Sequence, residues 1–423
     1  MLTRLTSAVR RRVSNASLRI VSPKAVTSLS RLLAKSPSSS VAVKDARSIV
    51  VVRSDGIGDL VLMSPFLREL RGSNPGAWIT LVVDEKFRNL VELCPHVNEV
   101  LGFDLNYRGR TVVPALVLRA LRLSIRHLRP RRFDLALVPR WDVDLYHSAY
   151  LAHFCGASCR VAYSENVLPE KQLSNRDFDS LLTRTVDDRT RKHELERNLD
   201  FLCEAGGTVE DNRLEVWLSE EDRAFAKKAL ASRGLAPSDL LIGLAPGAGA
   251  RKRLWPLNRF VELGRILQKE LGARLIVIGG AEDRERGIGL QEELGAAAGS
   301  FAGEMTLRQT AAILEHTPLV IANDSGPMHL AAAAGAAIVE ISCHPTSGEP
   351  GHANSPQRFG PWVQGCVVLQ PIEATEPCTS ACGGDEAHCI LGVSVEMVEA
   401  AARKLLATRQ RRSIVEAGER RAT

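Results

Sequence analysis

Short apolar runs alternate with helical patterns in two separate series along this chain of 423 residues. The first series begins at Ser48, and the second begins near Leu240. A strand, a helix and another apolar strand in repeated succession are typical of a parallel sheet with helices packed on its faces. Each series therefore predicts a parallel sheet of its own, and both halves of the chain belong to the α/β class.

A charged segment separates the two series. Residues 188–239 hold two charged helical patterns and end near Pro237 and Ser238, which is where we expect the domain boundary. The final helical pattern, VEMVEAAARKLLA, is followed by a basic stretch that we expect to fray. The sequence thus predicts a basic leader, two α/β domains and a basic tail, at residues 1–47, 48–237, 238–408 and 409–423.

Positive charge is concentrated in the leader. Residues 1–47 contain ten Lys or Arg and one acidic residue, whereas the whole chain carries a net charge of only +6. Leu, Val and Ile alternate with Arg at roughly helical spacing there. This pattern is typical either of a helix that lies on anionic lipid or of a disordered tail.

A second basic stretch, from Tyr107 to Arg132, holds eight Arg and no acidic residue. Its leucine spacing predicts an amphipathic helix whose cationic face is either solvated or turned toward an anionic membrane or a phosphorylated acceptor. No aromatic-rich strand or nucleic-acid motif accompanies the arginines, so we do not expect nucleic acid as a partner.

No run of eighteen apolar residues occurs, and the chain does not open with a secretion signal. Nine cysteines in such a chain indicate a reducing compartment. We therefore expect a cytoplasmic location, with attachment to the inner face of the cytoplasmic membrane if the basic stretches bind lipid.

Most of the cysteines lie in or beside apolar segments, where we expect them to pack. Cys378, Cys382 and Cys389 differ, because they lie with His388 in a Gly- and Asp-rich loop. Their spacing is compatible with zinc or iron, but it lacks the paired C-x2-C ligands of common zinc sites. The interpretation without a metal is therefore favoured.

The first strand of the first series runs into the turn R-S-D-G-I-G-D, in which Gly56 and Gly58 precede Asp59. The turn has only G-x-G, so it is not a dinucleotide-binding fingerprint. Asp59 lies at the start of the following helix, where the helix dipole favours an ionised carboxylate. Such a carboxylate can accept a proton.

The corresponding strand of the second series runs into a turn with Gly247 and Gly249, followed by Arg251, Lys252 and Arg253. Small residues allow a ligand to approach the backbone, and the three cations can neutralise a diphosphate. A cationic surface loop is the alternative. Farther on, Glu282 follows a strand end, where an acid can bind a ribose diol.

Residues 318–342 hold a strand, the turn Asn323 to Gly326, a helix of small residues and a second strand. Asp324 or Ser325 can cap this helix, Pro327 suits its first turn, and Gly335 ends it. The dipole and unpaired amides of such a helix favour an anion at its start. The alternative is purely structural, with capping by Asp324 and packing by His329.

The order and spacing of three segments resemble glycosyltransferase family 9, the ADP-heptose:lipopolysaccharide heptosyltransferases. These segments are GIGDLVLMSPFLRELR, APGAGARKRLWPLNRF and NDSGPMHLAAAAGA, and the resemblance extends over roughly residues 48–408. HELERNLDFL and CTSACGGDEAHCILGVSVEMV are also similar to that family.

The resemblance implies a GT-B architecture of two Rossmann-like domains that face each other across a cleft. The first domain would hold the acceptor, a lipopolysaccharide core or another glycan, and the second would hold the nucleotide sugar. Asp59 matches the catalytic base, Glu282 lies where a ribose-binding acid is expected, and either Lys252 or Arg253 would contact phosphate. The donor-binding turn of the family matches Asp324, Ser325, Gly326 and His329.

The function implied is an inverting, metal-independent transfer of a heptose or related sugar from an ADP-sugar, without a cofactor. Asp142 and Asp144 have D-x-D spacing, but we interpret them as acceptor-side or structural residues. One alternative is another GT-B enzyme of sugar nucleotides, such as a 2-epimerase. The other is a non-catalytic scaffold protein of the same fold.

Overall fold

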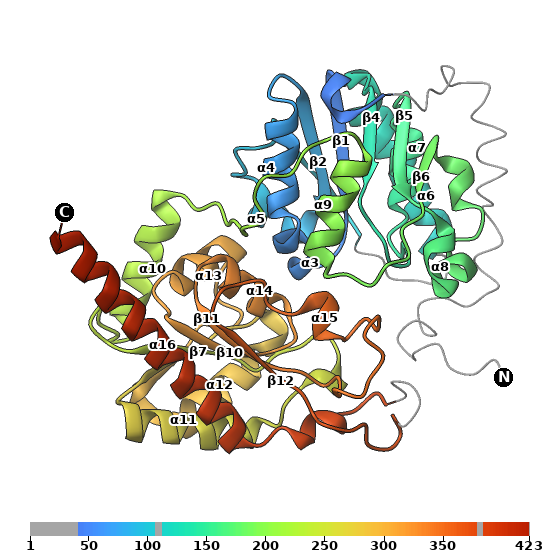
Figure 1. The fold of residues 1–423 in the computed structure, drawn as a ribbon. Coiled ribbons are helices and arrows are strands. Elements are labelled where there is room, and N and C mark those ends of the chain that lie inside the picture. Colours follow the sequence, from blue (N-terminus) through green and yellow to red (C-terminus); the bar gives the residue numbers. More distant parts are fainter. Residues whose placement is uncertain (1–40, 106–111, 379–383, 423) are drawn as a thin grey trace. The chain divides into compact units, whose positions relative to one another are not determined.

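The first series of apolar runs forms a six-stranded sheet in the computed structural model, which describes residues 41–105, 112–378 and 384–422 (Figure 1). Neighbouring strands are parallel throughout, in the order β3-β2-β1-β4-β5-β6. The strands are β1 (Ser48–Arg53), β2 (Trp78–Asp84), β3 (Glu99–Phe103), β4 (Leu135–Val138), β5 (Cys159–Tyr163) and β6 (Arg184–Val186).

The central strands of this sheet are buried on both sides, because helices cover both of its faces. Val50 and Val52 share a core with two of the helices, α6 and α7, whereas α4 packs beside α9. The helices are α3 (Ile57–Leu62), α4 (Ser64–Ser73), α5 (Arg88–Val91), α6 (Val112–Leu123), α7 (Ser148–Phe154), α8 (Pro169–Ser174) and α9 (Glu194–Glu204).

The second series forms another six-stranded parallel sheet, in the order β12-β11-β10-β7-β8-β9. Its strands are β7 (Leu241–Ala245), β8 (Arg274–Val277), β9 (Ala298–Ser300), β10 (Leu319–Asn323), β11 (Ala337–Ile341) and β12 (Cys366–Leu369). Its helices are α10 (Glu220–Ser232), α11 (Leu257–Leu271), α12 (Arg284–Leu294), α13 (Leu307–Leu314), α14 (Gly326–Ala333), α15 (Pro356–Phe359) and α16 (Val395–Ala422). Side chains of α11, α12 and α16 share one core with this sheet.

Both sheets have the same topology when their strands are numbered within each unit. The chain starts in the middle of the sheet, winds to one edge, returns to the middle and then winds to the other edge, which is the Rossmann order. The reversal lies between β1 and β4 in the first sheet and between β7 and β10 in the second. Ligands of such sheets bind beyond the carboxyl ends of the strands at this reversal. These two places are therefore where functional side chains are to be sought.

The boundary between the two units lies earlier than the sequence predicts. The first unit ends at Asn212 and the second begins at Arg213, whereas we expected the boundary between residues 237 and 238. The reason is α10, which packs against α13 of the second unit through ion pairs. Arg308 contacts Asp222 at 2.8 Å, and Arg223 contacts Glu315 at 3.1 Å.

Both predicted ends of the folded part also need correction. The last residues of the leader belong to the first unit, since Val43 is buried and its amide donates to the Ala205 carbonyl at 2.9 Å. The tail that we expected to fray continues α16 as far as Ala422. Residues 1–40 lie outside the described residues, as does part of the predicted Arg-rich helix, residues 106–111. Among the described helices, none is long and apolar enough to span a membrane.

Candidate functional site

The first candidate site lies beyond the carboxyl end of β1. Gly56 precedes α3 in an extended conformation, and its amide donates to Oδ2 of Asp59 at 3.2 Å. Gly58 lies in the first turn of the same helix. The helix breaks at Met63, and Pro65 occupies the first turn of α4, as expected from its missing amide hydrogen. Asp59 keeps a fifth of its side-chain surface exposed.

Arg53, the last residue of β1, is fully buried and holds the carboxylates of this site. Its Nη2 lies 2.9 Å from Oδ1 of Asp59, and its Nε lies 2.6 Å from Oδ2 of Asp55. Nη2 also contacts Glu194 on α9 at 3.2 Å. Arg140, just beyond β4, contacts Asp55 at 2.9 Å. The site therefore combines three carboxylates with two guanidinium groups at the reversal of the sheet.

These charges set the protonation of the two aspartates. Burial by itself raises the pKa of Asp59, but the positive charges of Arg53 and Arg140 outweigh it and hold that pKa below its usual value. Burial raises the pKa of Asp55 to about 6, against the lowering effect of Arg140 and Arg53. Asp59 is therefore ionised at neutral pH, and it is the more exposed of the two.

Sequence reasoning singled out Asp59 alone among the charged residues of this site. Arg53 and Asp55 belong to the same R-S-D-G-I-G-D segment as Asp59. Their closeness in sequence could therefore have identified both as residues of the site. Glu194 lies in the HELERNLDFL segment, 141 residues from Arg53 along the chain, and nothing local links the two. Asp144 has a structural role, because its carboxylate accepts the amides of Ser148 and Ala149 at the start of α7.

The second candidate site joins the turn after β7 to the turn after β10. Arg253 lies in a short 3-10 turn and donates from Nη1 to Oδ2 of Asp324 at 3.1 Å. Asn323 ties the two turns together, since it donates to the Pro246 carbonyl at 2.8 Å and accepts the Trp255 amide at 3.2 Å. The indole of Trp255 is buried and donates to the Val393 carbonyl at 2.9 Å.

The start of α14 lies beside this ion pair. Ser325 is the N-cap residue, but neither its side chain nor that of Asp324 caps the helix. The Ser325 hydroxyl is buried and has no hydrogen-bond partner among the described residues. His329 is buried in the next turn, and Gly335 ends the helix at a φ of +86°. An uncapped helix start with a buried hydroxyl is suited to an anionic ligand.

Glu340 on β11 lies behind this site and is fully buried. Burial raises its pKa well above the usual value, and the charge of Asp324 adds to the rise while Arg253 opposes it. The environment of the Glu340 carboxyl therefore favours its neutral form.

The remaining predicted donor residues are not all brought to this ion pair. Lys252 lines a cavity of about 140 Å³ with His344 and Cys378. Glu282 is exposed just past β8. Its neighbour Asp283 is buried, and a side chain at Gly247 would meet the Asp283 carboxylate at 2.1 Å. Sequence reasoning passed over Asp283, although it follows Glu282 directly.

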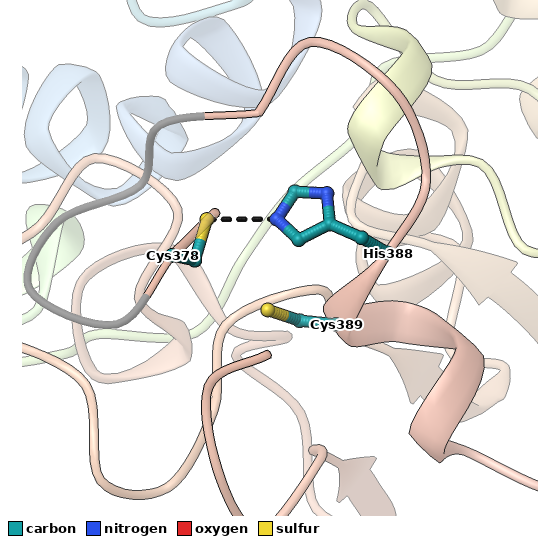
Figure 2. A group of neighbouring side chains, drawn as sticks. All are labelled: Cys378, His388 and Cys389. Carbon is teal, nitrogen blue, oxygen red and sulfur yellow. Dashed lines mark hydrogen bonds between the residues drawn. The ribbon is translucent and has the colours of Figure 1, made fainter. Parts of the chain in front are cut away.

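Three of the four side chains that the sequence offered as the less favoured metal site also come together. The ligand atoms of Cys378, His388 and Cys389 all lie within 4.8 Å of one another (Figure 2). Cys382 lies outside the described residues. Two other cysteines that we expected to pack, Cys203 and Cys366, are exposed.

The two sites offer different chemistry. The N-terminal unit presents an ionised, partly exposed carboxylate that is suited to accept a proton. The C-terminal unit presents a guanidinium, the start of a helix and a nearby lysine, which are suited to bind and neutralise a diphosphate.

Comparison with known proteins points to one family. The model of glycosyltransferase family 9 (heptosyltransferase) matches residues 121–379. Lipopolysaccharide heptosyltransferase 2 of Escherichia coli K12 is 26% identical over 306 residues, which cover 69% of this chain and 82% of that protein.

Solved structures show the same fold. A glycosyltransferase family 9 protein from Veillonella parvula has a TM-score of 0.71 at 24% identity, and the match covers 88% of this chain and 100% of that chain. The ADP-heptose lipopolysaccharide heptosyltransferase II of E. coli has a TM-score of 0.64 at 21% identity, covering 86% of this chain and 99% of that chain. The predicted GT-B fold with two Rossmann-like domains is thereby confirmed.

Proposed function

This chain belongs to glycosyltransferase family 9, and from that premise we propose that it transfers a heptose or a related sugar from an ADP-sugar to a lipopolysaccharide core or another glycan. One observation carries the proposal. In each unit, the residues that match the family lie at the reversal of the sheet, with Asp59 after β1 and Arg253 and Asp324 after β7 and β10. The names of the relatives, which are heptosyltransferases, support the choice of sugar.

In the proposed reaction, Asp59 acts as the general base. An acceptor hydroxyl attacks the anomeric carbon of the donor, and its proton passes to the Asp59 carboxylate. The bond between the anomeric carbon and the diphosphate oxygen breaks, ADP leaves with the electron pair, and the configuration at the anomeric carbon inverts. Supporting this role, the lowered pKa of Asp59 keeps the carboxylate ionised, and its exposed fraction leaves it accessible.

The leaving diphosphate is stabilised by the C-terminal unit in this proposal. Arg253 and Lys252 supply positive charge, and the amides of Ser325 and Gly326 at the start of α14 supply hydrogen-bond donors. The buried hydroxyl of Ser325 adds a further donor. These groups together take the part that Mg²⁺ has in other nucleotide-sugar enzymes, so we propose that the transfer step needs no metal and no cofactor.

The place of the reaction is also part of the proposal. An acceptor anchored in lipid requires an enzyme at the inner face of the cytoplasmic membrane. The exposed face of the Arg-rich stretch in the first unit supports this location, because it carries Leu118 and Ile125 beside Arg122 and Arg126.

The test is product analysis with the purified chain. ADP-heptose and a panel of UDP- and GDP-sugars are incubated with truncated lipopolysaccharide cores, and the products are identified by mass spectrometry and their anomeric configuration by NMR. We expect a heptosylated core of inverted configuration with ADP-heptose, at the same rate with and without added Mg²⁺. Epimerised sugar formed without any acceptor, or no product with any donor, would contradict the proposal.

A further inference from the structure

A group of two thiols and an imidazole lies in the loop between β12 and α16. Cys378 lies ten residues before His388 in this loop. His388 is the N-cap residue of the short 3-10 turn Cys389–Gly392, and Cys389 is the first residue of that turn (Figure 2). The Sγ atoms and the imidazole nitrogen all lie within 4.8 Å of one another. In a tetrahedral zinc site, bond lengths of about 2.0–2.3 Å place ligand atoms about 3.5–3.8 Å apart. The group therefore needs only small side-chain movements to surround a cation.

The hydrogen bonds of the His388 imidazole favour a tautomer that can bind a metal through Nε2. Its Nδ1 lies 2.6 Å from the carbonyl oxygen of Glu386. A carbonyl oxygen can only accept, so Nδ1 carries the proton and Nε2 presents a lone pair. Nε2 lies 2.7 Å from Sγ of Cys378. A metal-bound histidine typically donates its second nitrogen to a backbone carbonyl in this way.

Thr375 surrounds the Sγ atom of Cys389 with polar groups. The amide and the hydroxyl of Thr375 donate to this Sγ at 3.4 and 3.5 Å, and the thiol donates to the Thr375 carbonyl at 3.8 Å. The two donors would stay in place when a metal displaces the thiol proton, and they would then stabilise the metal-bound sulfur. A packing cysteine needs no such donors.

The surroundings of the group restrict water and hold the ring in place. Cys378 and Cys389 are buried at 8% and 3% exposure. A side chain at Gly384 would meet the His388 ring at 2.4 Å, so a larger residue there would displace the imidazole from its present position. Two thiolates and a neutral imidazole around a divalent cation form a neutral complex, which suits a largely buried place.

We propose that Cys378, His388 and Cys389 bind a thiophilic divalent cation, for which Zn²⁺ is the best fit. The thiols of Cys378 and Cys389 each release a proton when the metal binds, and Nε2 of His388 binds as the neutral imidazole. The three side chains supply three of the four tetrahedral ligands. This site is independent of the proposed glycosyl transfer, since none of its ligands takes part in that reaction.

The position of the site gives the metal a structural role beside the diphosphate turn. The three ligands line the cavity of about 140 Å³ that Lys252 also lines. Glu386, two residues before His388, contacts Arg251 at 3.0 Å. A cation that fixes this loop would therefore also fix the surroundings of the cationic turn.

The test is the metal content of the full-length chain. The protein is expressed with zinc in the medium, dialysed without chelator and analysed by plasma mass spectrometry. We expect about one zinc ion per chain. We expect Cys389→Ser and His388→Asn to retain less than about a tenth of that amount, and Cys366→Ser, which removes an exposed thiol of the same unit, to retain all of it.

Two results would overturn the proposal: a wild-type chain without stoichiometric metal, or a Cys389→Ser chain that holds as much as the wild type. Cobalt substitution keeps the proposal testable if the variants fail to fold. The wild-type chain loaded with Co²⁺ should show a thiolate-to-cobalt charge-transfer band and the visible bands of a tetrahedral ion. A spectrum of octahedral cobalt without thiolate bands contradicts the site.

Discussion

Arg253 donates from Nη1 to Oδ2 of Asp324 across 3.1 Å, and this bond joins the turn after β7 to the turn after β10. The pair holds the guanidinium at the uncapped start of α14, with only a quarter of the Arg253 side chain exposed. Positive charge is thereby fixed at the reversal of the sheet before any ligand arrives. A preorganised cation loses less entropy on binding a diphosphate than a mobile surface residue does.

Replacing this guanidinium is predicted to weaken nucleotide binding. Arg253→Ala removes a cation and also leaves the Asp324 carboxylate facing the diphosphate. A lost charged hydrogen bond costs about 1.5–3 kcal/mol, so we expect the Kd for ADP to rise by about 10- to 100-fold in isothermal titration calorimetry.

Arg251→Ala is the matched control for this prediction. Arg251 lies in the same 3-10 turn but is three-quarters exposed and contacts Glu386 instead. We expect its effect to stay within about 1 kcal/mol, as for other exposed ion pairs. Equal losses in both variants would mean that only the net charge of the turn matters.

Asp59 carries the sharpest prediction for catalysis. Asp59→Asn keeps the size of the side chain and its contact with the Gly56 amide, but it removes the proton acceptor. We expect kcat to fall by about 10²- to 10⁴-fold with ADP binding unchanged. Asp187→Asn, at an exposed carboxylate of the same unit, should keep full activity. Near-normal transfer by Asp59→Asn would remove Asp59 from the role of base.

The turns that end the strands could be predicted from sequence because their signals are local. The short segments around Asp59, Arg253 and Asp324 each contain the strand, the turn and the start of the helix that define the position. The parallel order of the strands then follows from the βα alternation. The family and the GT-B fold are confirmed, whereas the roles of the individual site residues stay predictions.

Long-range pairing is what the sequence did not disclose. Glu194 reaches Arg53 from 141 positions away, and no local pattern distinguishes a buried glutamate from a solvated one on a charged helix. The same difficulty displaced the domain boundary. The charged pattern of α10 predicts a helix but not the unit to which it belongs, and it is Asp222 on this helix that pairs with Arg308, 86 residues farther along the chain.

Asp55 gives a prediction for stability against pH. Burial raises its pKa to about 6, so between about pH 4 and pH 6 the folded chain holds a proton that the unfolded chain has released. Raising the pH through this window therefore lowers the free energy of unfolding contributed by this group. Asp59 has the opposite effect, and only at lower pH. Its pKa is lowered in the folded chain, so the stability that it contributes is lost as the pH falls.

Asp55→Asn should remove this dependence. The melting temperature of the variant, measured relative to the wild type, is expected to rise as the pH is increased from 4 to 6. The corresponding change in stability is about 1–3 kcal/mol, from about 1.4 kcal/mol for each pH unit over which the protonation differs. Parallel melting profiles of the two proteins across this window would contradict the raised pKa.

The Arg-rich stretch gives the last prediction, which concerns the membrane. Exposed Leu118 and Ile125 lie beside Arg122 and Arg126, so one face offers both apolar surface and positive charge. Each basic residue near an anionic surface contributes about 1 kcal/mol to binding. Replacing both arginines with glutamate exchanges attraction for repulsion, and we expect binding to anionic lipid vesicles in a flotation assay to fall by at least about tenfold.

Transfer to a soluble, delipidated acceptor should be unchanged, because neither arginine belongs to the two candidate sites. Equal vesicle binding by the variant and the wild type would assign membrane attachment to another part of the chain. If the variant lost both vesicle binding and transfer to the soluble acceptor, this face would instead hold the acceptor.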